Sequence, residues 1–125
     1  MDNKFLYKCD KVSVFHNNRK GFNLLANKKI NKDELISISA VSLVGFDEIK
    51  EDSILKNYPM YWNDEKDCIA FGIINLLNHS DNPNVRIEND YDNKLIKAFA
   101  IKDIEINEEL VMKYRCKIWF EVIDG

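Results

Sequence analysis

A short polar segment, residues 78–84, constrains the fold of this chain more than any other feature. Its sequence, Asn-His-Ser-Asp-Asn-Pro-Asn, follows a run that is apolar from Ala70 to Leu77 apart from Asn75. Asn, Ser and Asp side chains hydrogen-bond to their own neighbouring backbone, and Pro83 biases the residue before it away from the helical conformation. Taken alone, the pattern predicts a turn that closes a buried segment.

A second segment further along the chain changes this interpretation. Residues 108–114 are Glu-Glu-Leu-Val-Met-Lys-Tyr, and residues 98–104 before them have the composition of a strand and a turn. An Asn-His-Ser turn with Pro-Asn beyond it, followed by Glu-Glu-Leu and then a tyrosine, resembles the SET domain of protein lysine methyltransferases. The resemblance implies a mainly β fold with short helices and several small sheets. In that fold the 78–84 segment and the segment ending at Tyr114 meet in a pseudoknot-like C-terminal threading.

Composition bounds the class of protein. The chain has 125 residues, of which 46% are hydrophobic and 31% are charged, so we expect one domain over residues 1–125. A formal charge of −3 argues against direct nucleic-acid binding, which is typical of basic domains. No apolar run reaches membrane-spanning length, and the N-terminus lacks a signal-peptide pattern. We therefore expect a cytoplasmic or nuclear protein that is not secreted and does not bind membranes.

The three cysteines are scattered along the chain, which predicts reduced thiols and no metal site. Many eukaryotic SET proteins carry cysteine-rich zinc segments on either side of the domain, and this sequence matches neither segment. The chain is similar to the minimal, stand-alone SET domains of viruses and bacteria.

Periodicity predicts most of the secondary structure. Apolar alternation indicates strands at 5–9, 12–15, 35–39, 85–88 and 95–100. Residues 46–57 mix acids with isoleucine and leucine, which favours a helix, and 70–77 is predicted to be a buried short helix or turn. The apolar segment 117–122 is expected to fold back on the body.

The resemblance implies that S-adenosylmethionine binds to a Gly-x-Gly turn and the strand after it. Here the corresponding residues are Gly21, Phe22 and Asn23. Asn23 stands where the second glycine is expected. Because asparagine tolerates a left-handed backbone better than most residues, we expect the turn to be kept.

Further cofactor contacts follow from the same resemblance. Asn78 would hold the amino-acid end of the cofactor, the backbone of His79 would contact the adenine, and Tyr114 would lie beside the transferred methyl group. Trp119 would either stack on the adenine or fill the core. The side chain of His79 is interpreted as structural, because the sequence offers it no paired acid, base or metal partner.

The resemblance also implies a channel for the substrate lysine. A tyrosine of its wall would be Tyr58 or Tyr61, and the position that limits the number of methyl groups would be Met112 or Ile87. Neither of the last two carries a hydroxyl, and methionine is flexible, so we predict dimethyl- and trimethyl-lysine as products.

These residues suit a simple displacement. The nucleophile is a neutral amine, whereas free lysine has a pKa near about 10.4, so the site must desolvate the ammonium and aim its lone pair at the methyl group. The predicted function is S-adenosylmethionine-dependent methylation of a lysine in a histone tail or another basic protein, by a monomer or a homodimer.

Two other functions remain open from the sequence. One is a catalytically silent SET-like module that binds a protein tail or S-adenosylmethionine, and the other is a small β-rich interaction domain. Asn23 and Asn107 replace glycines of the family pattern, while Lys113 and Arg115 replace residues common there. The departures at Asn23, Lys113 and Arg115 favour the silent module.

Overall fold

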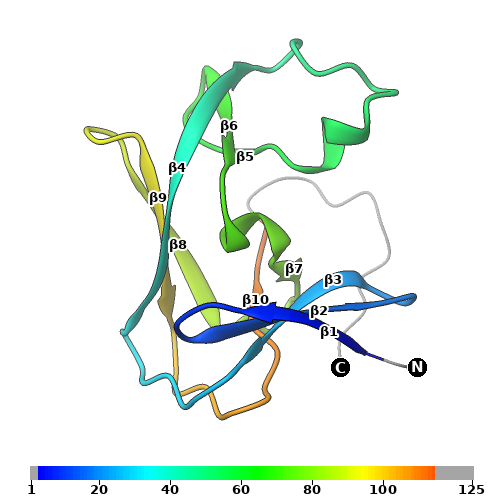
Figure 1. The fold of residues 1–125 in the computed structure, drawn as a ribbon. Helices are drawn as coiled ribbons and strands as arrows, with labels where there is room; N and C mark the ends of the chain where they lie inside the picture. Colours follow the sequence, from blue (N-terminus) through cyan, green and yellow to red (C-terminus); the bar gives the residue numbers. More distant parts are fainter. Residues whose placement is uncertain (1–2, 115–125) are drawn as a thin grey trace.

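The computed structural model describes residues 3–114, which are almost entirely β (Figure 1). They form ten strands and two short 3-10 helices, in the order β1 (Lys4–Lys8), β2 (Val12–Asn17), β3 (Gly21–Ala26), β4 (Leu35–Gly45), η1 (Ile54–Asn57), β5 (Met60–Tyr61), β6 (Lys66–Ala70), η2 (Ile73–Leu76), β7 (Asn78–His79), β8 (Val85–Asp90), β9 (Leu95–Ala100) and β10 (Val111–Met112). The mainly β fold predicted from the sequence is confirmed.

A three-stranded antiparallel sheet, β1-β2-β3, forms the lower part of the molecule in Figure 1. The alternating apolar residues of β2 and β3 bury one face of this sheet. The side chains on that face are Val12, Val14, Leu24 and Ala26, each 1% exposed. The opposite face carries Asn23, which pairs with Phe15 in the β2–β3 register.

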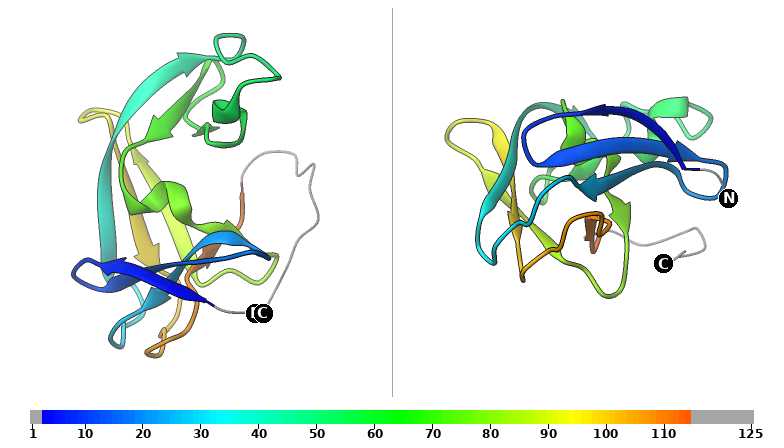
Figure 2. Two further views of the ribbon diagram at one scale, coloured as in Figure 1. Left: turned by 45° about the vertical axis from the view of Figure 1, so that its right-hand side comes forward. Right: turned by 60° about the horizontal axis from the view of Figure 1, so that its bottom comes forward.

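A seven-stranded sheet, in the order β5-β6-β4-β9-β8-β10-β7, forms the rest of the fold. The long strand β4 connects its two parts, because residues 35–40 pair with β9 and residues 41–45 pair with β6. Figures 1 and 2 show that the sheet curls along β4. The two sheets and η2 share one hydrophobic core.

The C-terminal described strand passes through an earlier part of the chain. β10 pairs in parallel with β7 on one side and with β8 on the other, through Val111–Asn78, Met112–His79 and Met112–Val85. β7 and β8 are joined by residues 80–84, so β10 lies between two strands that one loop connects. This is the predicted pseudoknot-like threading, which is rare among protein folds.

A glycine next to η2 lets the chain turn toward β7. Gly72 has φ 130°, and a Cβ atom at this position would lie 2.9 Å from the Ser39 Oγ atom. Both the backbone and the close approach therefore require glycine.

The structure corrects the expected helices. Residues 46–53 are not helical, and only Ile54–Asn57 form a 3-10 turn, capped by the Ser53 hydroxyl, which accepts from the Leu55 N–H. Ile54 is 86% exposed, so a helix here would bury no apolar face, and such a short helix is not stable alone. Within 70–77 only Ile73–Leu76 form a 3-10 turn.

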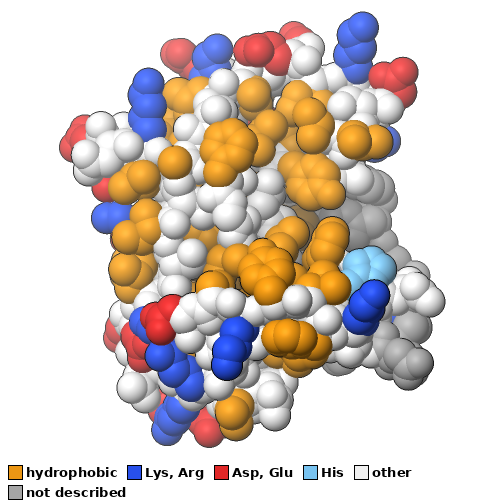
Figure 3. All heavy atoms as spheres, viewed as in Figure 1, with side chains coloured by type: hydrophobic (Ala, Val, Ile, Leu, Met, Phe, Trp, Pro, Cys, Tyr) orange, Lys and Arg blue, Asp and Glu red, His pale blue; other side chains and the backbone are white. Residues whose placement is uncertain are grey.

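Hydrophobic side chains gather on the face shown in Figure 3, and charged side chains lie mostly around its rim. Such an apolar surface is typical of a protein that contacts other macromolecules. Among residues 3–114, no helix has the length and apolar character needed to cross a membrane. Trp119, Arg115 and the apolar segment 117–122 lie outside the described residues.

Candidate active site

Tyr114 follows β10 directly, and β7 determines its position. Its backbone N–H donates to the His79 Nδ1 atom at 2.9 Å, and its hydroxyl donates to the Leu77 carbonyl at 2.9 Å. The Tyr114 and His79 rings also meet edge to face, with centroids 5.0 Å apart. Backbone, ring and hydroxyl of this tyrosine are thus each held by residues 77–79.

The side chain of His79 is fully buried. Because Nδ1 accepts the Tyr114 N–H, the proton of the neutral ring lies on Nε2, where Asp81 Oδ1 accepts it at 3.1 Å. A structural role for this side chain, as the sequence predicted, agrees with these contacts. The expectation that it lacks an acidic partner is wrong, since Asp81 lies only two residues further on.

Asn78 ties β7 to β3. Its side-chain amide donates to the Phe22 carbonyl and to Glu109 Oε2, both at 3.0 Å. The other oxygen of Glu109 accepts from Lys20 Nζ at 2.6 Å. The Lys20 and Glu109 side chains are only 7% and 18% exposed, so solvent screens this ion pair less than a surface pair.

Residues 21–23 begin β3 next to this network. Gly21 has φ 75°, and a Cβ atom there would meet nothing within 4 Å. Phe22 is 44% exposed, with its ring against His16. The expectation that Asn23 would need a left-handed backbone is wrong, because Asn23 lies in regular β3 pairing and Gly21 makes the turn.

Asn23 is 5% exposed. Its amide nitrogen donates to Asn3 Oδ1 at 3.2 Å, whereas its Oδ1 atom accepts no hydrogen bond from the described residues. A buried carbonyl oxygen without a donor costs about 1–3 kcal/mol.

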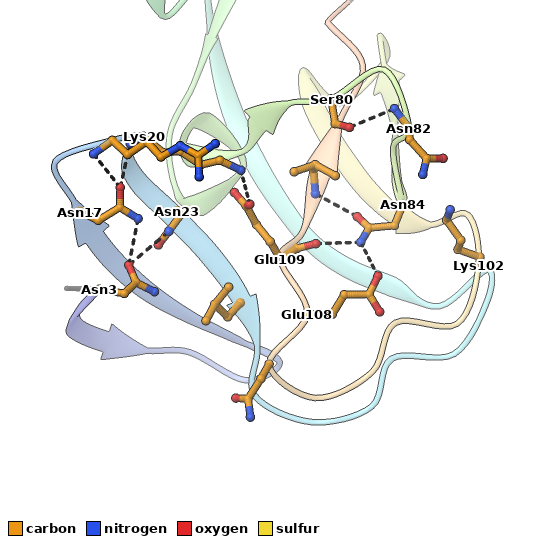
Figure 4. A pocket seen from close by; sticks show the side chains of 14 residues that line it. Asn3, Asn17, Lys20, Asn23, Ser80, Asn82, Asn84, Lys102, Glu108 and Glu109 are labelled. Atoms are coloured by element: carbon orange, nitrogen blue, oxygen red, sulfur yellow. Dashed lines mark hydrogen bonds and ion pairs between the residues drawn. The ribbon is translucent and has the colours of Figure 1, made fainter. Parts of the chain in front are cut away.

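A polar cavity of about 710 Å³ lies beside these residues (Figure 4). Lys20 and Asn23 line one side, Ser80 and Asn82 line another, and Glu108 and Glu109 lie between them. Its volume is within the range of small-molecule sites, about 300–1,000 Å³. Of the predicted cofactor residues within 3–114, Asn23 is the one that lines this cavity, and Ser80 lines it next to the 78–79 segment.

Asn84 fixes the start of β10 from the wall of the same cavity. Its Oδ1 accepts the Val111 N–H at 2.9 Å, and its amide nitrogen donates to the Glu109 carbonyl at 2.8 Å. Figure 4 shows Asn84 between Glu108 and the chain at Glu109. The Asn84 side chain thus bonds to the backbone of residues 109 and 111 as a neighbouring strand would, and it fixes the start of β10.

The four candidates for the lysine channel differ in how deeply they are buried. Met112 is 4% exposed in the core, and Ile87 packs against that core from β8. Tyr58 and Tyr61 are each 38% exposed, and the Tyr61 hydroxyl donates to Asp64 at 3.3 Å. Hydrogen bonds join residues 22, 78, 79 and 114 in one group.

Sequence reasoning missed Lys20, Glu109 and Asn84 as parts of the site. Glu109 belonged to a recognised signature, but its partners lie 89 and 31 residues away, and no local pattern indicates such pairs. Within 3–114, no group of three or more His, Cys, Asp or Glu side chains is arranged to hold a metal ion.

Comparisons with known proteins agree with this arrangement. The SET domain family model matches residues 21–115. A histone-lysine N-methyltransferase of Schizosaccharomyces pombe, specific for lysine 37 of histone H3, is 31% identical over 106 residues, which cover 82% of this chain and 72% of the relative. The chain belongs to the SET domain family, and the family predicted from residues 78–84 and 108–114 is confirmed. Both findings support lysine methyltransferase activity in general.

Solved structures show the same fold. A candidate histone methyltransferase of Plasmodium falciparum superimposes with a TM-score of 0.70 at 24% identity, over 90% of this chain and all of the other. A humanized mutant of the Chaetomium thermophilum Polycomb Repressive Complex 2, bound to the inhibitor GSK126, gives a TM-score of 0.69 at 20% identity. The match covers 86% of this chain and 15% of that one.

Proposed function

We propose that this chain is an S-adenosylmethionine-dependent N-methyltransferase that acts on the ε-amine of a lysine in a histone tail or another basic protein. Family membership and the named activity of the Schizosaccharomyces pombe relative support the reaction class. The observation that carries the proposal is the Tyr114 hydroxyl, held 2.9 Å from the Leu77 carbonyl next to Asn78 and His79.

The hydrogen-bond direction suggests how Tyr114 acts. Its O–H donates to the Leu77 carbonyl, so the lone pairs of the phenolic oxygen are left to accept from the substrate amine. An amine held in this way is oriented toward the methyl group that S-adenosylmethionine supplies on its sulfonium centre. Alignment at near-attack distance lowers the barrier without a metal or a covalent intermediate.

Contacts between segments 21–23 and 78–79 support the proposed cofactor site. The Asn78 amide donates to the Phe22 carbonyl at 3.0 Å, which brings two of the predicted cofactor residues together. Because β7 is the end strand of its sheet, one side of its backbone faces away from β10, as an adenine contact by His79 requires. Gly21, Phe22, Asn23, Asn78, His79 and Tyr114 remain the proposed cofactor residues.

The catalytically silent module is the rival, and its support from Asn23 weakens. Asn107 takes the left-handed conformation, with φ 69°, which asparagine tolerates, and Asn23 lies in regular pairing. Lys113 is exposed next to Tyr114. These departures from the family pattern leave the Tyr114 contacts intact, which favours the active enzyme.

Incubation of the purified chain with methyl-labelled S-adenosylmethionine, recombinant histones and a cell extract tests the proposal. We expect labelled lysines, identified by mass spectrometry of tryptic peptides. Calorimetry with S-adenosylmethionine, run in parallel, distinguishes the rival functions. Binding without transfer to any protein would favour the silent module, and the absence of binding would favour an interaction domain.

A further inference from the structure

The aromatic segment 58–62, which contains both candidate channel tyrosines, has little support from the sheet that contains it. Strand β5 has only two residues, lies at the end of the seven-stranded sheet, and pairs with β6 through Met60–Cys68 and Tyr61–Asp67. A two-residue strand at a sheet edge is weak by itself.

Side chains from a distant part of the sheet hold this segment. Asn89 Nδ2 donates to the Tyr61 carbonyl at 3.1 Å and to the Trp62 carbonyl at 3.2 Å. The Tyr91 hydroxyl donates to the same Trp62 carbonyl at 2.9 Å. Asn89 lies in β8, and three strands separate β8 from β5 in the sheet order.

Ring packing supports these hydrogen bonds. Trp62 is 3% exposed, and its ring meets Tyr91 edge to face with centroids 4.8 Å apart. The β8–β9 hairpin thus contacts the end of β5 through two side-chain donors and one aromatic pair, in which Trp62 is buried and Tyr91 is exposed, closing the curl of the sheet. We call Asn89 and Tyr91 together the hairpin clamp.

We propose that the hairpin clamp positions the aromatic segment, and so sets the alignment of the substrate lysine. The inference rests on the proposed function, in which Tyr58 or Tyr61 forms the channel wall. The side-chain hydrogen bonds of the clamp go to the carbonyls of Tyr61 and Trp62, at the aromatic segment. A weakened clamp therefore disturbs the amine more than the cofactor.

The test compares Tyr91→Phe, which removes one hydroxyl, and Asn89→Ala with the parent chain. Asn93→Ala is the matched control, because Asn93 lies in the same hairpin and bonds to Asp90. For each protein we would measure amide hydrogen exchange over residues 58–63, S-adenosylmethionine affinity by calorimetry, and kcat and KM with the histone or extract protein that the parent methylates.

For both clamp variants we expect faster exchange at 58–63 and a kcat lowered about tenfold, since small misplacements of reacting groups cost rate steeply. Cofactor affinity should stay at the parent value, and Asn93→Ala should change none of these quantities. Faster exchange with unchanged kcat would overturn the inference, as would parent-like exchange at 58–63. An equal loss of cofactor affinity and kcat would also overturn it, by indicating general destabilisation. If the parent itself transfers no methyl group, the proposed function fails, and the inference fails with it.

Discussion

At the scale of single residues, the Tyr114 hydroxyl is the group on which the proposed chemistry depends. Tyr114→Phe keeps the ring against His79 and the backbone bond to Nδ1 but removes the oxygen. We expect kcat to fall at least tenfold, which is about 1.4 kcal/mol of transition-state stabilisation. Cofactor affinity should change little.

Single-turnover methyl transfer with labelled cofactor measures this effect. Tyr7→Phe, at an exposed position in β1, is the control for loss of a tyrosine hydroxyl. Equal turnover by Tyr114→Phe and the parent would remove Tyr114 from the reaction.

Asn78 is expected to act on cofactor binding. Asn78→Ala removes the amide that bridges the Phe22 carbonyl and Glu109, and leaves their oxygens without this donor. Calorimetry should show S-adenosylmethionine binding weakened by about tenfold, or about 1.4 kcal/mol. Asn75→Ala, which removes an amide bond to the Ala70 carbonyl, controls for lost stability. Tight binding by a folded Asn78→Ala variant would refute the assignment.

Two substitutions at His79 separate its role as an acceptor from its bulk. Asn places an oxygen near the position of Nδ1, whereas Gln places its amide near Nε2. We expect His79→Gln to lose the Tyr114 N–H bond, at a cost of about 1–3 kcal/mol, and most of kcat. His79→Asn should keep more of kcat even where its melting temperature falls. Equal kcat for the two variants would contradict a positioning role for Nδ1.

At the scale of elements, alternation predicted the strands that bury one face, such as β2 and β9. It did not predict β6, where Lys66 and Asp67 interrupt the apolar pattern, nor the second half of β4. Those segments form because β4 and β6 pair with each other. The propensities of single residues do not indicate which distant strand will pair with them. The helix expected over 46–57 was wrong because propensity likewise does not show whether a segment has an apolar face to bury.

Strand β6 also contains a group that makes stability depend on pH. Burial raises the pKa of Asp67 above its ordinary value of 3.8. The folded state therefore prefers the protonated acid, and the parent loses stability as pH rises from the unfolded pKa through the folded one. Asp67→Asn avoids this loss, so we expect it to be more stable than the parent at pH 7, by a small amount because solvent screens the partly exposed carboxylate. The difference should shrink below pH 3.8 in chemical unfolding.

Glu34, just before β4, has a pKa shift in the opposite direction to that of Asp67. A hydrogen bond from Lys11 holds the pKa of Glu34 below its ordinary value, with Nζ 2.7 Å from the carboxylate. Its stabilisation is present above the unfolded pKa and is lost as pH falls through the folded pKa. Glu34→Gln should therefore be less stable than the parent at pH 7, and the gap should close in acid. If Asp67→Asn and Glu34→Gln changed the stability at pH 7 in the same direction, the opposite pKa shifts assigned to Asp67 and Glu34 would be contradicted.

We propose that the number of methyl groups added is decided where β8 and β10 meet the core. Of the two channel candidates, Met112 is buried, so Met112→Tyr is expected to overpack the core and cost about 1–3 kcal/mol. Ile87 is only partly buried, and Ile87→Tyr should be tolerated. If Ile87 lines the channel, the hydroxyl should shift the products from dimethyl- and trimethyl-lysine toward monomethyl-lysine.

Mass spectra over a long time course test this prediction, with Ile87→Phe as the control that adds a ring without a hydroxyl. If the parent stops at monomethyl-lysine despite excess cofactor, the argument from the missing hydroxyl is wrong.

At the scale of the whole molecule, the family and the fold class could be predicted, because two short signatures lie in the right order. The hydrogen-bond and ion-pair partners of the site residues could not be predicted. Lys20 meets Glu109, and Asn84 meets Val111, only because β10 enters between β7 and β8. Periodicity describes neighbours along one element, whereas these contacts depend on the path of the chain.

The position of β10 between β7 and β8 has a consequence for the order of folding. The β1–β2–β3 and β8–β9 hairpins can form from local contacts soon after each is synthesised, but the parallel pairs of β10 join residues far apart in the sequence. Contacts of that kind form slowly. On the ribosome, residues 78–84 must wait for the Tyr114 segment to emerge, so the proposed catalytic centre is among the last parts of the molecule to be completed.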